Sequence, residues 1–97
     1  MSCLVIVEFL CKQGRSEEFI DMCRRNYPVT RAYDGCKYVF LSVDKDDENS
    51  LVMVEEWDSK EHHQNYVAFR ESDGTSDFMD PLLTCAPTVR YLDITDA

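Results

Sequence analysis

The two clearest strand signals in this chain predict strands that are apolar on both faces. Residues 3–11 read CLVIVEFLC and residues 36–43 read CKYVFLSV. A strand with one face in water alternates apolar and polar side chains, and these segments leave little to face water. Helices packed on one side of a sheet cover only one of its faces, so the other apolar face needs a partner. This requirement constrains the fold more than any other feature of the sequence.

The first helix is expected to start at Ser16, which is a good N-cap residue. Glu17 and Glu18 follow it and suit the positive end of a helix dipole. Apolar side chains then recur at helical spacing as far as Tyr27. Pro28 has no backbone N–H, so we expect it to end or kink this helix.

The middle of the chain predicts a hairpin followed by a second helix. An acidic loop at residues 44–50 separates the second strand from a third strand at residues 51–57. We interpret this loop as a solvated connection rather than a metal site. Asp58 and Glu61 are spaced as in a capping box, which predicts a helix from Asp58 to about Arg70.

A short apolar helical patch at residues 78–83 and a last strand at residues 89–94 complete the order of elements. An order of strand, helix, strand, strand, helix, short helix and strand is typical of the α+β, ferredoxin-like split βαβ fold. That fold has one antiparallel sheet with helices on one face. The uncovered apolar face is most simply buried against a second copy through a two-fold axis. We therefore predict a single domain over residues 1–97 that forms a homodimer, a dimeric α+β barrel.

The charge and the cysteines exclude several classes of function. A net charge of −9 provides no basic face for nucleic acid, and an anionic membrane surface would repel the chain. The five cysteines are an odd number without a C-x-x-C pair, which favours reduced thiols and a cytoplasmic setting over a disulfide scaffold. The apolar run at the start is interrupted by Glu8, and we interpret it as a strand rather than a signal peptide.

Two motifs resemble those of a known family. Residues 30–36, TRAYDGC, are similar to a T-R-A-x-x-G-C motif, and residues 55–61, EEWDSKE, are similar to an E-x-W-x-[DS]-x-E motif. Both are typical of the antibiotic biosynthesis monooxygenase (ABM) family of the dimeric α+β barrel superfamily. With the element order, the resemblance covers nearly the whole chain and implies the same fold. That family includes quinone-forming monooxygenases, haem-degrading enzymes, an isomerase-like branch and many members of unknown activity.

The chain departs from the family pattern at several positions. Tyr66 stands where many relatives carry a histidine in the second helix, and Val39 stands where a tyrosine is frequent. The haem-degrading branch needs an asparagine in the first strand and a histidine in the second helix. These two positions fall near Val7 and Val67. Haem degradation is therefore not expected.

The resemblance implies oxygenation of a small phenol or hydroquinone with no cofactor and no metal. The substrate loses a proton and its anion reacts with oxygen, so the protein needs an apolar slot, a base and a donor for the oxyanion. Glu55 and Trp57 share one face of the third strand, and His63 and Tyr66 are neighbours on the second helix. We assign catalytic roles to His63, Tyr66 and Glu55, with His62 as the alternative base and Arg90 as the alternative to Tyr66 for holding the anion. Contacts to an apolar or aromatic substrate are assigned to Trp57, Phe9, Phe40, His62, Phe69 and Arg90.

Each assignment has a structural alternative. Trp57 could be a packing residue at a strand end, and Tyr66 a contact between helix and sheet. His62 and His63 lie about 100° apart on a helix, so they cannot hold one metal together and at least one is expected at the surface. Two other functions stay open: a non-catalytic dimer that is structural or binds a small apolar molecule, and an isomerase of a small oxygenated metabolite. The enzyme hypothesis predicts a mostly apolar pocket lined by Trp57 and at least one histidine.

Overall fold

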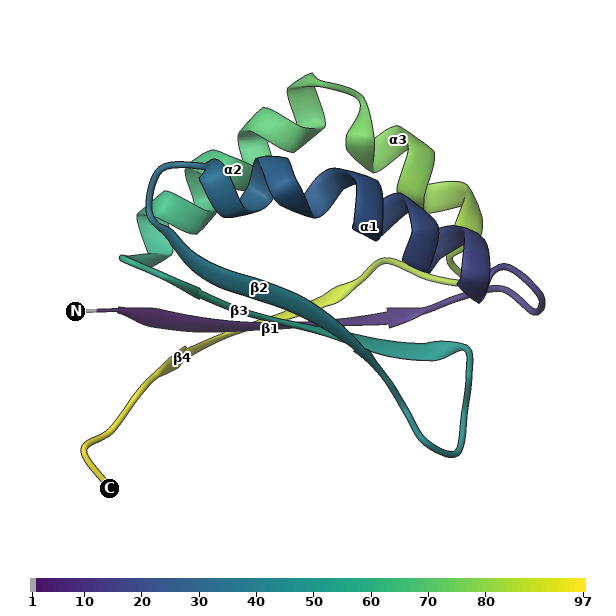
Figure 1. Ribbon diagram of the computed structural model, residues 1–97, viewed down its shortest axis with the longest axis horizontal. Coiled ribbons are helices and arrows are strands. Elements are labelled where there is room, and N and C mark those ends of the chain that lie inside the picture. The colour runs from purple at the N-terminus through teal and green to yellow at the C-terminus, as the bar shows by residue number, and fades with distance from the viewer. Residues whose placement is uncertain (1) are drawn as a thin grey trace.

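The computed structural model describes residues 2–97 and contains one antiparallel sheet of four strands (Figure 1). The strands are β1 (Cys3–Leu10), β2 (Cys36–Val43), β3 (Ser50–Trp57) and β4 (Thr88–Asp93), in the sheet order β2-β3-β1-β4. The first strand thus lies between the third and the fourth, which is the split βαβ arrangement. It confirms the ferredoxin-like α+β prediction, and the strand bounds agree with the predicted ones to within one residue.

The helices of residues 2–97 all lie on one face of this sheet (Figure 1). They are α1 (Ser16–Ala32), α2 (Lys60–Ser72), α3 (Thr75–Met79) and the 3₁₀ helix η1 (Asp80–Leu82). The N-cap of α1 is Arg15, and the predicted N-cap residue, Ser16, is the first helical residue. In this same part of the chain, no helix is both long and apolar enough to cross a lipid bilayer.

The inner face of the sheet, which the helices cover, carries the hydrophobic core. In β1 the buried side chains are at every second position, including Val5, Val7 and Phe9, as the pleat of a strand requires. β3 pairs with β1 so that Glu55 lies opposite Val5, which places Glu55 on the inner face as well. The core is completed from α1 by Phe19, Met22, Cys23 and Tyr27.

The middle of the outer face of the sheet is apolar, and no helix of the described residues covers it. Ile6 and Val54 pair across β1 and β3, and Phe40 of β2 pairs with Val54. Phe40 is 48% exposed although it lies in the middle of a strand. Arg90 of β4 also falls on this face, opposite Ile6. The expected apolar outer face is therefore present, and the second copy that would cover it stays a prediction.

Of the two predicted effects of Pro28, the end of the first helix is wrong, because α1 continues to Ala32. A proline inside a helix removes one backbone hydrogen bond, but the Pro28 ring lies on the exposed side of α1. Its neighbours Tyr27 and Thr30 are buried, and the Thr30 hydroxyl also contacts α2. Tertiary packing on both sides of Pro28 therefore outweighs its local preference.

The N-cap of the second helix lies one residue later than predicted. Ser59, and not Asp58, is the N-cap of α2, and its Oγ accepts the backbone N–H of His62 at 3.1 Å. The backbone N–H of Asp58 donates instead to the carbonyl oxygen of Gly35 at 2.8 Å. Asp58 thus holds the end of β3 against the turn before β2, and Ser59 takes over the capping role.

Replacing Pro28 with alanine is expected to stabilise the protein. The free energy of unfolding should rise by about 1–3 kcal/mol, because alanine restores a helical hydrogen bond and has a much higher helix propensity. Proline also restricts the unfolded chain, which reduces the gain. Urea denaturation followed by circular dichroism measures the change. Arg25→Ala, at a nearby exposed position, is the control and should shift stability by less than about 0.5 kcal/mol. A Pro28→Ala protein no more stable than the wild type would contradict this account of α1.

Candidate functional site

A cavity of about 510 Å³ lies between the inner face of the sheet and the helices, a volume in the range of small-molecule sites. Its floor consists of inward side chains of β1, β3 and β4, namely Val7, Phe9, Met53 and Val89. Met22 of α1 and Met79 of α3 form part of its walls, and α2 contributes His63, Tyr66 and Arg70. The cavity floor is therefore apolar, and the polar groups of the lining lie on the helices.

Cys23 of α1 adds a further apolar surface to the cavity wall. Burial raises the pKa of the Cys23 thiol to about 11, so the side chain is a small neutral group near neutral pH. All five cysteines are free thiols in the described structure. Within residues 2–97, no three His, Cys, Asp or Glu side chains converge as a metal site requires.

A buried carboxylate lies directly behind the cavity wall. Glu55 of β3 is 0% exposed, and its Oε1 accepts the indole Nε1–H of Trp57 at 2.7 Å. Its Oε2 has no hydrogen-bond partner among residues 2–97 and lies 3.5 Å from Nε2 of His63. An unpaired carboxylate in an apolar interior is strongly unfavourable. The His63 imidazole is therefore the group that balances this second oxygen.

His63 of α2 connects this carboxylate to the last strand. The residue is 3% exposed, and it lines the cavity. Its Nδ1 lies 2.9 Å from the hydroxyl oxygen of Tyr91 on β4. The imidazole is also edge-on to the rings of Trp57 and Tyr91, with centroids 5.6 and 5.4 Å away. Both imidazole nitrogens thus face protein groups, and a polar chain runs from Glu55 through His63 to Tyr91.

The register of the sheet explains why these residues meet. Val5 of β1 lies opposite Glu55 on one side and opposite Tyr91 on the other. The three side chains therefore form a row across three strands of the inner face. The start of α2 at Lys60 sets the helical phase so that His63 is buried above this row.

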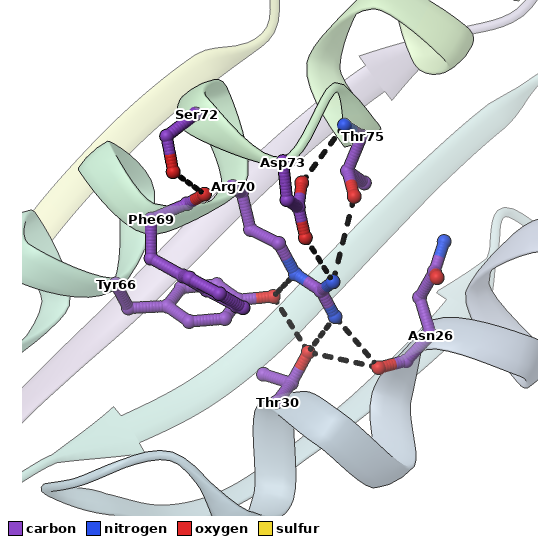
Figure 2. Close-up of polar contacts among 8 residues, drawn as sticks. All are labelled: Asn26, Thr30, Tyr66, Phe69, Arg70, Ser72, Asp73 and Thr75. Carbon is purple, nitrogen blue, oxygen red and sulfur yellow. Dashed lines mark hydrogen bonds and ion pairs between the residues drawn. The ribbon is translucent and has the colours of Figure 1, made fainter.

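A second polar cluster joins α1 to the end of α2 (Figure 2). Arg70 donates from Nε to the Tyr66 hydroxyl at 2.8 Å. Its Nη2 donates to the Asn26 carbonyl at 2.8 Å and to Thr30 Oγ1 at 3.3 Å. The hydroxyl oxygens of Thr30 and Tyr66 are 2.6 Å apart. Side chains of α2 are in this way hydrogen-bonded to the C-terminal half of α1.

The remaining donors of Arg70 hold the segment after α2. Nη1 donates to Asp73 Oδ2 at 3.1 Å and to Thr75 Oγ1 at 3.4 Å (Figure 2). The five N–H bonds of the guanidinium are matched by five acceptors, so binding a ligand anion would require breaking one of these contacts. Burial raises the pKa of the Tyr66 hydroxyl, and the hydrogen bonds with Arg70 and Thr30 offset part of the rise.

A model of the antibiotic biosynthesis monooxygenase (ABM) family matches residues 2–79. The chain belongs to this family. Three solved structures show the same fold. Rv0793 from Mycobacterium tuberculosis has a TM-score of 0.86 at 22% identity, covering 100% of this chain and 98% of that chain. An antibiotic biosynthesis monooxygenase has a TM-score of 0.85 at 20% identity, covering 96% and 98%. A mutant of SnoaB, a cofactor-independent oxygenase from Streptomyces nogalater, has a TM-score of 0.84 at 14% identity, covering 99% and 95%. No curated protein matches the sequence significantly.

Three of the residues that the sequence assigned to an ABM-type site line the cavity: His63, Tyr66 and Phe9. Glu55 and Trp57 lie behind this wall. Trp57 is 0% exposed, and its ring centroid is 5.1 Å from that of Tyr66. The Trp57 ring therefore packs against the rings of His63 and Tyr66 from the sheet side. The expectation that Trp57 lines the pocket does not hold in this structure.

The structure does not bring Phe40, Arg90 or Phe69 to this cavity. Phe40 and Arg90 lie on the outer face of the sheet, since the register pairs them with the outward residues of β3 and β1. Phe40 also borders a separate cavity of about 300 Å³ at the β2 edge. Phe69 of α2 stacks on Tyr33, with centroids 5.2 Å apart. These contacts were predicted from residue type alone. Each side chain lies on a face of the sheet or helix that does not border the cavity.

His62 has a structural position at the junction of sheet and helix. Its side chain is 35% exposed, and its Nδ1 lies 2.7 Å from Ser59 Oγ. The ring packs on Gly35, where φ is +91° and an added Cβ would come within 2.5 Å of the imidazole. Glycine is required there both for the positive φ and for this close approach. One histidine is thus inside and the other near the surface, as the sequence suggested.

Tyr91 and Arg70 received no role from the sequence. The polar Arg90 between Val89 and Tyr91 is a signal that the two flanking residues point inward, so alternation alone could have placed Tyr91 in the core. Tyr66 and Arg70 are four residues apart on α2, which is the spacing of a helical pair. The contacts of either residue outside its own element depend on the tertiary structure.

Tyr66→Phe is expected to lower the free energy of unfolding by about 1–3 kcal/mol, because Arg70 and Thr30 lose a buried hydrogen-bond partner. Urea denaturation measures the loss. Tyr33→Phe removes the same group where it makes only a 3.5 Å contact to the Asn65 carbonyl, so the change should be under about 0.5 kcal/mol. Equal losses in the two variants would show that the Arg70 cluster contributes no specific stability.

Proposed function

We propose that this ABM-family protein is a cofactor-independent monooxygenase that oxidises a small aromatic phenol or hydroquinone. The observation that carries the proposal is His63, a nearly fully buried histidine that lines a largely apolar cavity and has the carboxylate of Glu55 behind it. A histidine that contacts a cavity is a suitable general base for a ligand bound there.

The cavity suits a flat, uncharged ring. Its floor is apolar, and its volume of about 510 Å³ accommodates a small aromatic molecule. Two exposed carboxylates, Glu71 and Asp80, border it and disfavour an anionic substrate. Arg70, which also lines it, is already paired with Asp73. These features support a substrate that enters neutral and loses its proton inside.

In the proposed reaction the substrate first loses a proton from its hydroxyl group or from the activated ring carbon. The proton ends on the His63 imidazole, and the carboxylate of Glu55 stabilises the resulting cation. The electron-rich anion then reacts with dioxygen. At an anthrone-type CH₂ carbon, two C–H bonds are replaced by one C=O bond, and both hydrogens leave with the second oxygen atom as water. The apolar walls limit the access of bulk water to the reactive anion.

A second candidate function is binding of a small apolar molecule without catalysis. The observation that favours it is the saturation of the two basic side chains at the cavity. Arg70 directs its five donors to protein acceptors, and both nitrogens of His63 face protein groups. Neither Arg70 nor His63 therefore offers a free donor for an oxyanion.

Oxygen uptake with a panel of hydroquinones and anthrones distinguishes these functions. The wild type should consume oxygen with at least one of them, and His63→Gln should reduce kcat by about 10²–10⁴-fold through loss of the base. His62→Gln is the matched control on the neighbouring residue, and it should retain the wild-type rate. Uptake by none of the substrates would favour the binding role, and equal rates in wild type and His63→Gln would remove His63 from the mechanism.

We also propose that two copies of the chain form a homodimer through the outer faces of their sheets. Support comes from the row of apolar residues across the middle of that face, namely Leu4, Ile6, Phe40, Val52 and Val54. A contiguous apolar surface of this kind, left open to water, is typical of an interface rather than of a monomer. A two-fold axis would place the same surface on both partners.

Val54→Lys is expected to convert the dimer to a folded monomer, because two lysines would be buried at the centre of the interface. Sedimentation velocity at micromolar concentration should give twice the chain mass for the wild type and the single mass for the variant. Val29→Lys, at an exposed position of α1 on the opposite side, should remain a dimer. A wild-type protein that sediments as a monomer would refute the proposed interface.

A further inference from the structure

Two residues of α1, Cys23 and Tyr27, line both of the cavities described above. They lie one helical turn apart on the face of α1 that packs against the sheet. On this face they lie between Phe19, which packs on Phe9 with ring centroids 4.8 Å apart, and Thr30, which contacts α2. The two cavities therefore flank α1, and Tyr27 is the larger of the two side chains that both cavities share.

The hydroxyl of Tyr27 is buried and has no hydrogen-bond partner within residues 2–97. The residue is only 8% exposed, and an unpaired polar group in the interior is unfavourable, so a phenylalanine would fit better if packing were its only role. The thiol of Cys23 is close to it, but a thiol is only a weak hydrogen-bond partner. Asn49 and Glu55 also carry an unpaired buried oxygen, and neither residue lines the cavity. The unpaired hydroxyl of a lining residue points to a ligand as its partner.

The other strong donors at the larger cavity are already engaged. Arg70 directs its N–H bonds to protein acceptors, and both nitrogens of His63 face protein groups. The hydroxyl of Tyr66 contacts both Arg70 and Thr30. Tyr27 therefore adds a donor that these three side chains do not provide.

We propose that the Tyr27 hydroxyl donates a hydrogen bond to the oxygen of a phenol, hydroquinone or ketone bound in the cavity of about 510 Å³. This inference rests on the proposed function, since it concerns the substrate of the same site. It assigns a catalytic role to a residue of α1, which holds the substrate oxygen while that oxygen carries negative charge. A hydrogen bond to an anionic oxygen is stronger than one to a neutral oxygen, so this donor favours the ionised substrate.

The surroundings of Tyr27 suit a donor rather than a base. Burial, together with nearby Cys23 and Glu55, raises the pKa of the Tyr27 hydroxyl, which therefore keeps its proton near neutral pH. The guanidinium carbon of Arg31 lies 5.7 Å from the centre of the ring and helps to hold the ring in place. Met22 and Cys23 belong to the same cavity wall, and a flexible thioether and a small thiol allow this wall to adapt to a ligand oxygen.

Two ligands of similar shape test this hydrogen bond: 1-naphthol, which carries an oxygen, and 1-methylnaphthalene, which does not. Isothermal titration calorimetry measures their binding at neutral pH in the absence of dioxygen. Tyr27→Phe should weaken the binding of 1-naphthol by about tenfold and that of 1-methylnaphthalene by less than about twofold, because only the first loses a hydrogen bond. Tyr33 does not line the cavity, so Tyr33→Phe is the control and should bind both ligands as the wild type does.

The stability of the variant separates a ligand contact from a structural role. Because the Tyr27 hydroxyl has no protein partner, Tyr27→Phe should unfold at the same urea concentration as the wild type or at a higher one. Tyr66→Phe, which loses its contacts with Arg70 and Thr30, should unfold at a lower concentration. A destabilised Tyr27→Phe protein would show that the hydroxyl is bonded within the protein, and this would overturn the inference.

The binding outcomes are distinct from those of the proposed function. Equal binding of 1-naphthol by the wild type and Tyr27→Phe would overturn the inference, and this is the result expected if the hydroxyl bonds only to a buried water molecule. Equal weakening of the two ligands, or a wild type that binds neither, would also overturn it. Selective loss of 1-naphthol binding, with no oxygen uptake from any hydroquinone or anthrone, would refute the monooxygenase and leave the role of Tyr27 standing. Oxygen uptake by the wild type, with unaltered 1-naphthol binding in Tyr27→Phe, would do the reverse.

Discussion

The arrangement of this molecule depends on one buried carboxylate. Glu55 has no exposed surface, and a charge in such a place is tolerated only when it is paired and hydrogen-bonded. Trp57 satisfies one oxygen from the same strand, whereas His63 approaches the other from α2. The contact between Glu55 and His63 is therefore a polar link between α2 and the sheet, beside the contact of His63 with Tyr91. The cavity lies beside this link, so the same interaction shapes the fold and the proposed site.

Two polar clusters border the cavity, and they differ in what they can do. The Arg70 cluster is saturated, since its donors meet acceptors from α1, α2 and the start of α3 (Figure 2). That arrangement suits a structural tie between two helices. The chain from Glu55 to Tyr91 has a hydroxyl at one end and a carboxylate at the other. Its central residue, His63, lines the cavity, and this is why we propose the chemistry there and not at Arg70.

The fold was largely predictable because it follows from local patterns. The apolar runs of β1 and β2, the turn residues and the order of elements predict the sheet, and the structure confirms it. The site was predictable only in part. Phe40 and Arg90 are on the wrong face because a strand's sequence does not say which of its faces the helices cover. The end of α1 was predicted too early, at Pro28. Proline disfavours a helix only over a single turn, and the burial of Tyr27 and Thr30 outweighs this local effect.

The sequence by itself determined the element order and the pairing of Glu55 with Trp57 on one strand face, since these depend on residues a few positions apart. The tertiary structure alone decided that His63, and not His62, lines the cavity. It also decided that Tyr91 contacts His63. The contact between His63 and Tyr91 joins residues 28 positions apart, and the contact between Arg70 and Asn26 joins residues 44 apart. Such contacts arise when β1 pairs with both β3 and β4 and the helices pack on one face, because these events bring distant segments together without any local signal.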